Sequence, residues 1–122
     1  QQVLDMLAPV IADERSRPSG FVLLRIDPHR TLFPMIQTWP LPSKSGEFLL
    51  VEQRGMKVVF LNELRHRKDL SLRLARGIDE ETLPATHAAL GKTLFMEGTD
   101  YRGIPVIAAT QPVPGTPWGL VA

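Results

Sequence analysis

The stretch DYRGIPVIAATQPVPGTPWGLV, residues 100–121, decides the fold of this 122-residue chain. An apolar run at 104–113 lies between two turn signals, YRG at 101–103 and PGTPW at 114–118. The preceding segment TLFMEGTD, residues 93–100, is a further short apolar run. The end of the chain therefore predicts three consecutive strands joined by tight turns.

A second pair of strands is predicted upstream of these three. EFLLVEQ at 47–53 and KVVFLNE at 57–63 are rich in apolar and β-branched residues. Only a few residues, centred on Arg54 and Gly55, separate the two runs. Such a short connection containing glycine predicts a hairpin.

TLPATHAALG, residues 82–91, predicts a short helix between the hairpin and the final strands. Thr82 is placed to cap its N-terminus, Pro84 falls in the first turn, and Gly91 is placed to end it. The alternating leucines of LSLRLA, residues 70–75, favour a short strand or an extended segment before this helix.

The first third of the chain predicts a helix, a strand and a second helix. QQVLDMLAPVIADER, residues 1–15, carries apolar side chains at helical spacing, which predicts a short amphipathic helix interrupted near Pro9. FVLLRID at 21–27 is typical of a buried strand, and PHRTLFPMIQTW at 28–39 places its apolar residues on one side of a helix. We therefore expect an N-terminal helix and linker over 1–20 and a single domain over 21–122.

These elements predict an α+β fold. The core is a five-stranded antiparallel sheet with flanking helices, and an N-terminal helix precedes it. Helices inserted between the second and third strands follow a PAS-like plan. A sheet of this kind buries one face against helices and can curve around a small cavity.

Composition and charge are those of a globular protein. The chain is 43% hydrophobic and 22% charged, with 14 Lys and Arg against 13 Asp and Glu, for a net charge of +1. A near-neutral chain without a basic face does not predict nucleic-acid binding. The chain has no cysteine, which excludes disulfides, thiolate nucleophiles and cysteine-ligated metal clusters.

The C-terminal stretch resembles the closing hairpins of Cache domains, the extracytoplasmic PAS-like sensors of bacterial receptors. The resemblance rests on Tyr101 and Gly103 in the turn, the apolar PVIAATQPV at 105–113, and Gly115 with Trp118 before the last strand. FVLLRIDPHRTLFPMIQTWP and GEFLLVEQRGMKVVFLNELRHR resemble the strand, the connecting helix and the first hairpin of the same domains.

The resemblance implies a domain that sits between two membrane helices of a histidine kinase, diguanylate cyclase or chemoreceptor. Such domains bind amino acids, carboxylates, amines and other small ligands in the cavity of the sheet. We therefore expect a periplasmic portion of an inner-membrane protein, whose chain continues beyond Ala122 into a membrane helix.

NELRHRKD, residues 62–69, is the first candidate site. Arg65 or Arg67 would clamp a carboxylate bidentately, with His66 and Asn62 supplying further hydrogen bonds. The alternative is a solvated turn whose charges pair with the neighbouring acidic residues.

DYRG, residues 100–103, is the second candidate site. Tyr101 would donate its hydroxyl to a ligand and Asp100 would accept an ammonium group. The alternative is a turn chosen for its geometry, in which the aspartate and glycine serve the backbone. On the following strand Thr110 and Ala108 share one face, where small side chains leave room for a ligand or for a covering helix.

Metal and catalytic motifs are not found in the sequence. No two of the three histidines have the i, i+4 spacing of a helical metal site, and there is no nucleophile elbow or phosphate-binding glycine loop. We therefore expect no metal, no cofactor and no enzymatic activity. The best enzymatic alternative pairs Glu63 with His66 as acid and base.

The sequence thus predicts a sensor domain that binds a small anionic or zwitterionic metabolite. Its first alternative is a ligand-free PAS-like dimerisation or signal-relay module. That module would have a packed interior and a homodimer contact through one face of the N-terminal helix, formed by Val3, Leu7 and Val10.

Overall fold

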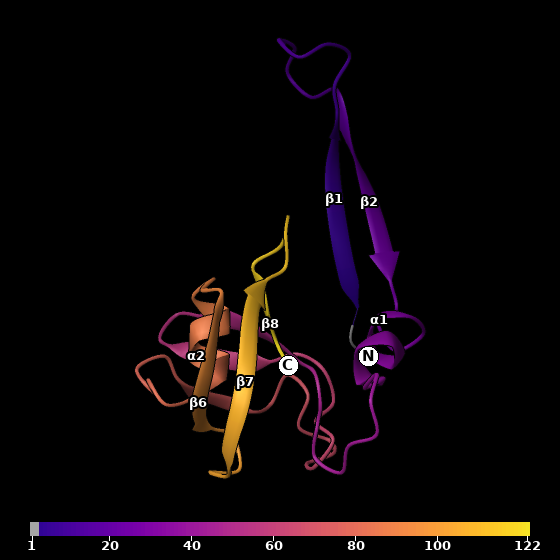
Figure 1. Ribbon diagram of the computed structural model, residues 1–122. Helices are drawn as coiled ribbons and strands as arrows, with labels where there is room; N and C mark the ends of the chain where they lie inside the picture. Colours follow the sequence, from indigo (N-terminus) through magenta and orange to yellow (C-terminus); the bar gives the residue numbers. More distant parts are fainter. Residues whose placement is uncertain (1–2) are drawn as a thin grey trace. The chain divides into compact units, whose positions relative to one another are not determined.

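The computed structural model describes residues 3–122 and divides the chain into two compact units, Gln1–Pro34 and Met35–Ala122 (Figure 1). Gln1 and Gln2, the first residues of the predicted N-terminal helix, lie outside the described residues. The helix α1 (Leu32–Gln37) spans the division between the units and lies within the predicted helix at 28–39.

The first unit is built on a hairpin of β1 (Leu4–Val10) and β2 (Gly20–Ile26). The two strands are antiparallel and pair over their full length, from Leu4 with Ile26 to Val10 with Gly20. The predicted N-terminal helix is therefore wrong. Pro9 lies in the middle of the expected helix, where it would remove a backbone hydrogen bond, whereas a two-stranded ribbon tolerates it.

Both faces of this hairpin carry apolar side chains. On one face Leu7 and Phe21 are 65% and 63% exposed, and on the other Met6 and Val22 are 56% and 57% exposed. The strand predicted at 21–27 to be buried is therefore exposed. Asp5 and Arg25 form a cross-strand ion pair at 2.8 Å near the open end of the hairpin. Because this pair is exposed, it contributes little to stability.

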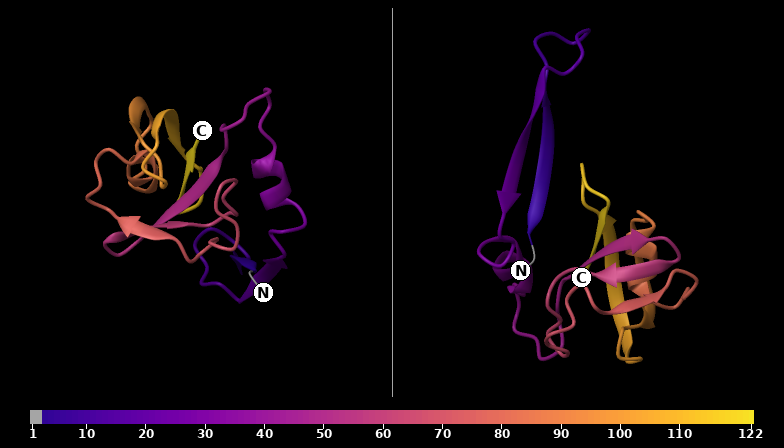
Figure 2. Two further views of the ribbon diagram at one scale, coloured as in Figure 1. Left: turned by 90° about the horizontal axis from the view of Figure 1, so that it is seen from below. Right: turned by 180° about the vertical axis from the view of Figure 1, so that it is seen from behind.

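The second unit contains a curled antiparallel sheet of six strands in the order β5-β4-β3-β8-β7-β6 (Figure 2). Its strands are β3 (Leu49–Arg54), β4 (Lys57–Phe60), β5 (Ala75–Gly77), β6 (Leu94–Thr99), β7 (Pro105–Pro112) and β8 (Trp118–Val121). The α+β class is confirmed, and five of these strands correspond to the predicted sheet.

The sixth strand, β5, pairs with β4 at the edge of the sheet and shares only Ala75 with the short strand or extended segment predicted at 70–75, which was not counted in the predicted sheet. The alternating leucines at 70–74 form turns rather than an extended segment, and Leu72 adopts a left-handed φ of 57°. Hydrogen bonds to the end of β4 hold these turns: the amide of Leu72 donates to the carbonyl of Phe60 at 2.7 Å. The alternation of leucines therefore predicted the wrong local structure, because hydrogen bonds to the end of β4 hold residues 70–74 in turns.

The turns of the sheet follow local chemistry. Gly55, with φ of 60°, takes the first position of the two-residue turn between β3 and β4, as a type II′ turn requires. Pro114 and Gly115 occupy the central positions of the turn between β7 and β8. Gly115 has φ of 73° there, and the amide of Thr116 donates to the carbonyl of Val113.

The helix α2 (Pro84–Ala89) packs against β8, β7 and β3 and covers the inner face of the sheet (Figure 1). Its N-cap is Leu83 and makes no side-chain capping bond, so the predicted cap by Thr82 is wrong. The carbonyl of Thr82 instead accepts a hydrogen bond from the amide of Thr99 on β6. Gly91 follows the helix with φ of 72°, which agrees with its predicted role in ending it.

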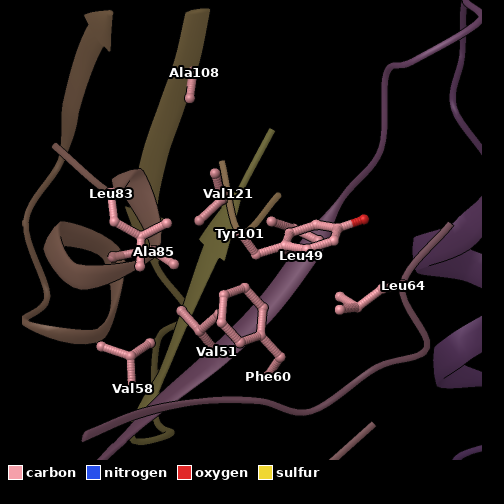
Figure 3. Close-up of a cluster of buried hydrophobic side chains, with 11 residues drawn as sticks. Leu49, Val51, Val58, Phe60, Leu64, Leu83, Ala85, Tyr101, Ala108 and Val121 are labelled. Atoms are coloured by element: carbon pink, nitrogen blue, oxygen red, sulfur yellow. The ribbon is translucent and has the colours of Figure 1, made fainter. Parts of the chain in front are cut away.

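The main core lies between α2 and the inner face. Figure 3 shows this cluster, in which Val51, Val58 and Phe60 are fully buried. On β7, Ala108 and Thr110 are buried while Ile107 and Ala109 are exposed, which confirms the predicted faces of that strand.

Candidate functional site

A cavity of about 360 Å³ opens on the inner face of the sheet in the second unit. Its wall combines the loop 39–47, the start of α2 at 83–85, the turn at 100–102, the beginning of β7 at 105–108 and the final residues 121–122. We call it the Tyr101 cavity. Its volume falls in the range of sites that hold small molecules.

The loop 39–47 forms one wall of the Tyr101 cavity. The indole of Trp39 packs on the ring of Phe48, with ring centroids 4.8 Å apart. Gly46 leaves room for this indole, since a Cβ there would lie 2.7 Å from Cε2 of Trp39. Packing of an aromatic side chain against glycine therefore fixes the course of this wall.

Tyr101 joins the core to the cavity. Its ring packs edge-on against Phe60 with centroids 5.8 Å apart, and its hydroxyl oxygen points away from the apolar cluster (Figure 3). The hydroxyl donates to Oε1 of Glu47 at 2.7 Å. Burial, followed by the hydrogen bond to Glu47 and the charge of that carboxylate, raises the pKa of Tyr101 far above its usual value. The Tyr101 hydroxyl therefore stays protonated near neutral pH and donates its hydrogen to Glu47.

Glu47 connects three parts of the chain. While Oε1 accepts the Tyr101 hydroxyl, Oε2 accepts the backbone N–H of Arg65 at 2.9 Å. Glu47 was not predicted as a site residue. The sequence does hold a signal for it, because Glu47, Leu49 and Val51 alternate, so an acidic side chain heads a face that is otherwise apolar.

Asp100 organises the turn between β6 and β7. Its Oδ1 accepts the amides of Arg102 and Ile104 at 2.8 and 3.0 Å, and its Oδ2 pairs with the Arg102 guanidinium at 2.6 Å. The amide of Gly103 closes the turn onto the Asp100 carbonyl. Asp100 and Gly103 thus stabilise the backbone of the turn, as the alternative reading of DYRG proposed. Asp100 and Tyr101 also line the cavity.

The pKa of Asp100 reflects two opposed effects. Burial alone raises the pKa of this carboxyl, but the hydrogen bonds from the Arg102 side chain and from the amides of Ile104 and Arg102 outweigh it. The net pKa lies below the usual value of 3.8. Ionised Asp100 therefore stabilises the folded chain above about pH 3.8, and this contribution is lost as the pH falls through the lowered pKa.

We expect Asp100→Asn to lower the free energy of unfolding by about 1–3 kcal/mol near neutral pH, because the amides of Arg102 and Ile104 and the Arg102 guanidinium lose a charged acceptor. The difference between the variant and the parent chain is expected to shrink as the pH falls through the lowered pKa of Asp100, since the carboxyl group is then protonated. Urea unfolding over a series of pH values from neutral to acid measures this difference. Glu97→Gln, an exposed change on β6, serves as the control and is expected to shift stability by less than about 0.5 kcal/mol. A deficit for Asp100→Asn that stays constant over the whole pH series would contradict this assignment.

The basic segment NELRHRKD, residues 62–69, contacts the loop 39–47 that forms one wall of the Tyr101 cavity. The Arg65 guanidinium donates to the carbonyls of Gly46 and Ser43 at 2.6 and 2.9 Å, so it fastens the loop 39–47. Nε2 of His66 lies 3.4 Å from the carbonyl of Ser45. Among residues 3–122, no hydrogen bond joins the His66 ring to Glu63, the predicted acid–base partner.

The other predicted site residues lie away from the cavity wall. Arg67 closes a tight turn through its amide on the carbonyl of Leu64 at 3.3 Å. Asn62 is 1% exposed, and its amide group bonds only to backbone groups. Thr110 is 3% exposed, and its hydroxyl donates to the carbonyl of Lys92 at 2.7 Å.

Comparison with known proteins gives no assignment: no known protein family, no curated protein and no solved structure matches this chain. Between residues 3 and 122, neither helix is long and apolar enough to cross a membrane. Over the same residues, His, Asp and Glu side chains form no group of three that could hold a metal ion.

Proposed function

We propose that this chain is the ligand-sensing domain of a membrane-bound bacterial receptor of the Cache type, on the periplasmic side of the inner membrane. It binds a small anionic or zwitterionic metabolite in the Tyr101 cavity. The output domain of such a receptor is a kinase, a cyclase or a chemotaxis module. The sensing domain itself carries no catalysis.

The observation that carries this proposal is the Tyr101 cavity. A tyrosine hydroxyl, two carboxylates and a guanidinium lie beside an apolar floor, which is the usual composition of a small-molecule site. The strands β3, β4, β6, β7 and β8 are antiparallel, with α2 inserted between the second and the third, as expected of a PAS-like sheet.

Signalling follows from where the cavity lies. Val121 at the end of β8 and Ala122 after it form part of the cavity wall, and β8 is a central strand between β3 and β7. A ligand that contacts these residues together with the Tyr101 turn favours one arrangement of β8. It shifts the population of signalling states by as much as its affinity for the two states differs.

The ligand-free relay module is less well supported. That alternative calls for a packed interior, whereas the second unit contains the Tyr101 cavity. Its dimer contact also relied on one face of a helix. In β1, Leu7 and Val10 lie on opposite faces of the strand, so they do not form that contact surface.

The test is a thermal-shift screen against amino acids, organic acids and amines. A ligand at a hundredfold excess over its dissociation constant stabilises by about 2.7 kcal/mol, which raises the melting temperature on the order of 10 °C. Val106→Phe places a ring on the inner face at the cavity wall, and we expect it to abolish the shift. Ala109→Phe puts the same ring on the exposed face of β7 and should retain it. No shift with any compound, for a folded parent chain, would overturn the proposal.

A further inference from the structure

The charges around the Tyr101 cavity are not balanced. Of its two carboxylates, Asp100 pairs with Arg102, the guanidinium that lines the cavity. Among the described residues, Glu47 has no ion-pair partner, and its two hydrogen bonds come from neutral donors, the Tyr101 hydroxyl and the Arg65 amide. One negative charge at the wall is therefore uncompensated.

The neighbouring cations do not neutralise Glu47. The Arg65 guanidinium is directed to the carbonyls of Gly46 and Ser43. Lys68 and Glu47 both line a second cavity of about 310 Å³, but they form no ion pair in the described structure. The negative charge of Glu47 attracts Arg102 electrostatically, but the Arg102 guanidinium forms its ion pair and hydrogen bond with Asp100.

Glu47 also keeps the capacity to bind a further donor. An ionised carboxylate offers about four lone-pair sites, and the two hydrogen bonds of Glu47 occupy two of them. Since the side chain is half-buried, its charge is less screened than that of a fully exposed carboxylate. A cation with several N–H donors satisfies both the charge and the remaining lone pairs.

Resting on the sensing function proposed above, we propose that the ligand carries an ammonium group and that Glu47 accepts its hydrogen bonds. The specificity-determining residue is thus Glu47, which lines the cavity together with the apolar side chains of Leu49, Ala108 and Val121. The sequence predicted an anionic or a zwitterionic ligand. The need for an ammonium group favours the zwitterionic class over simple anions and adds primary amines as candidate ligands.

The experiment measures binding to the full chain by calorimetry and thermal shift. The probes are α-amino acids, the amines obtained by removing their carboxylate, and analogues in which the ammonium is acetylated or replaced by a hydroxyl. We expect binding only from compounds with a free ammonium group. Comparing amino acids with the matching amines distinguishes a zwitterionic from a purely cationic ligand.

The matched variants are Glu47→Gln and Glu97→Gln. Glutamine at 47 retains an oxygen and removes the charge, so we expect affinity to fall about 10- to 100-fold, the range for a charged hydrogen bond. Glu97→Gln makes the same change in net charge on the exposed face of β6 and should leave affinity unchanged. If Glu47→Gln does not fold, the acetylated and hydroxyl analogues tested on the parent chain decide the question.

The outcomes separate this inference from the function on which it rests. Binding restricted to organic acids, or equal affinity of the acetylated analogues, overturns the role of Glu47 and leaves the sensing function standing. Unchanged affinity in a folded Glu47→Gln variant does the same. No binding by any probe, together with no shift in the wider screen, overturns both.

Discussion

Replacing Asn62 with alanine is expected to lower the free energy of unfolding by about 3–5 kcal/mol in the absence of any ligand. Asn62 is 1% exposed, and its Oδ1 accepts the amide of Leu50 at 2.7 Å. Its Nδ2 donates to the carbonyls of Phe48 and Glu63 at 3.0 and 3.1 Å. Alanine leaves the buried amide of Leu50 and the part-buried carbonyls of Phe48 and Glu63 without these partners, which is more costly than losing the bonds alone.

Urea unfolding measures this loss, and Gln53→Ala provides the matched control. Gln53 is exposed, and its side-chain Nε2 donates to the carbonyl of Gly55 at 3.1 Å. Because this hydrogen bond lies at the surface, Gln53→Ala should change the free energy of unfolding by less than about 0.5 kcal/mol. A similar small effect for Asn62→Ala would contradict the structural role. It would return Asn62 to the ligand-binding role that its position in NELRHRKD first indicated.

The fold of the second unit could largely be predicted because its information is local. Gly55, Gly103 and Gly115 each adopt a positive φ at a turn, and the apolar runs next to these turns, β3, β4, β6, β7 and β8, are each long enough for one strand. Pro84 and Gly91 bracket α2 in the same way. Turn chemistry of this kind is visible in a few consecutive residues.

The first unit could not be predicted in this way. Residues 3–10 are almost continuously apolar, so a helical and an extended reading fit nearly equally well. The decision depends on pairing with residues 20–26, a non-local interaction that spacing within one segment does not reveal. The exposed apolar faces of the hairpin explain why the sequence predicted a buried strand there.

The candidate site shows the same division between local and non-local information. Tyr101 and Asp100 were predicted as site residues because their turn signal is strong, and both line the cavity. Arg65 was noted for its charge, but its guanidinium bonds to the carbonyls of the loop 39–47. Glu47 lies 54 positions from Tyr101, and only the fold brings the two together.

We expect Gly119→Ala to destabilise the chain by about 3 kcal/mol, the upper end of the usual cost of overpacking. Gly119 lies on the inner face of β8, directly beneath α2. A Cβ at this position would overlap the backbone carbonyl of Ala88 and lie 2.9 Å from the Ala88 Cβ. Backbone atoms of a packed helix do not rotate away as a flexible side chain does, so α2 must move off the sheet.

The displacement also reaches the cavity, because Leu83 and Ala85 at the start of α2 form part of its wall. Gly119→Ala should therefore lose stability in urea unfolding and weaken the ligand-induced thermal shift. Gly20→Ala is the matched control, since a Cβ on Gly20 meets no atom within 4 Å, and its effect should stay within about 0.5 kcal/mol. An unfolding midpoint for Gly119→Ala equal to that of the parent chain would mean that α2 does not rest on β8 at this distance. The position of α2 as part of the wall of the Tyr101 cavity would then be wrong.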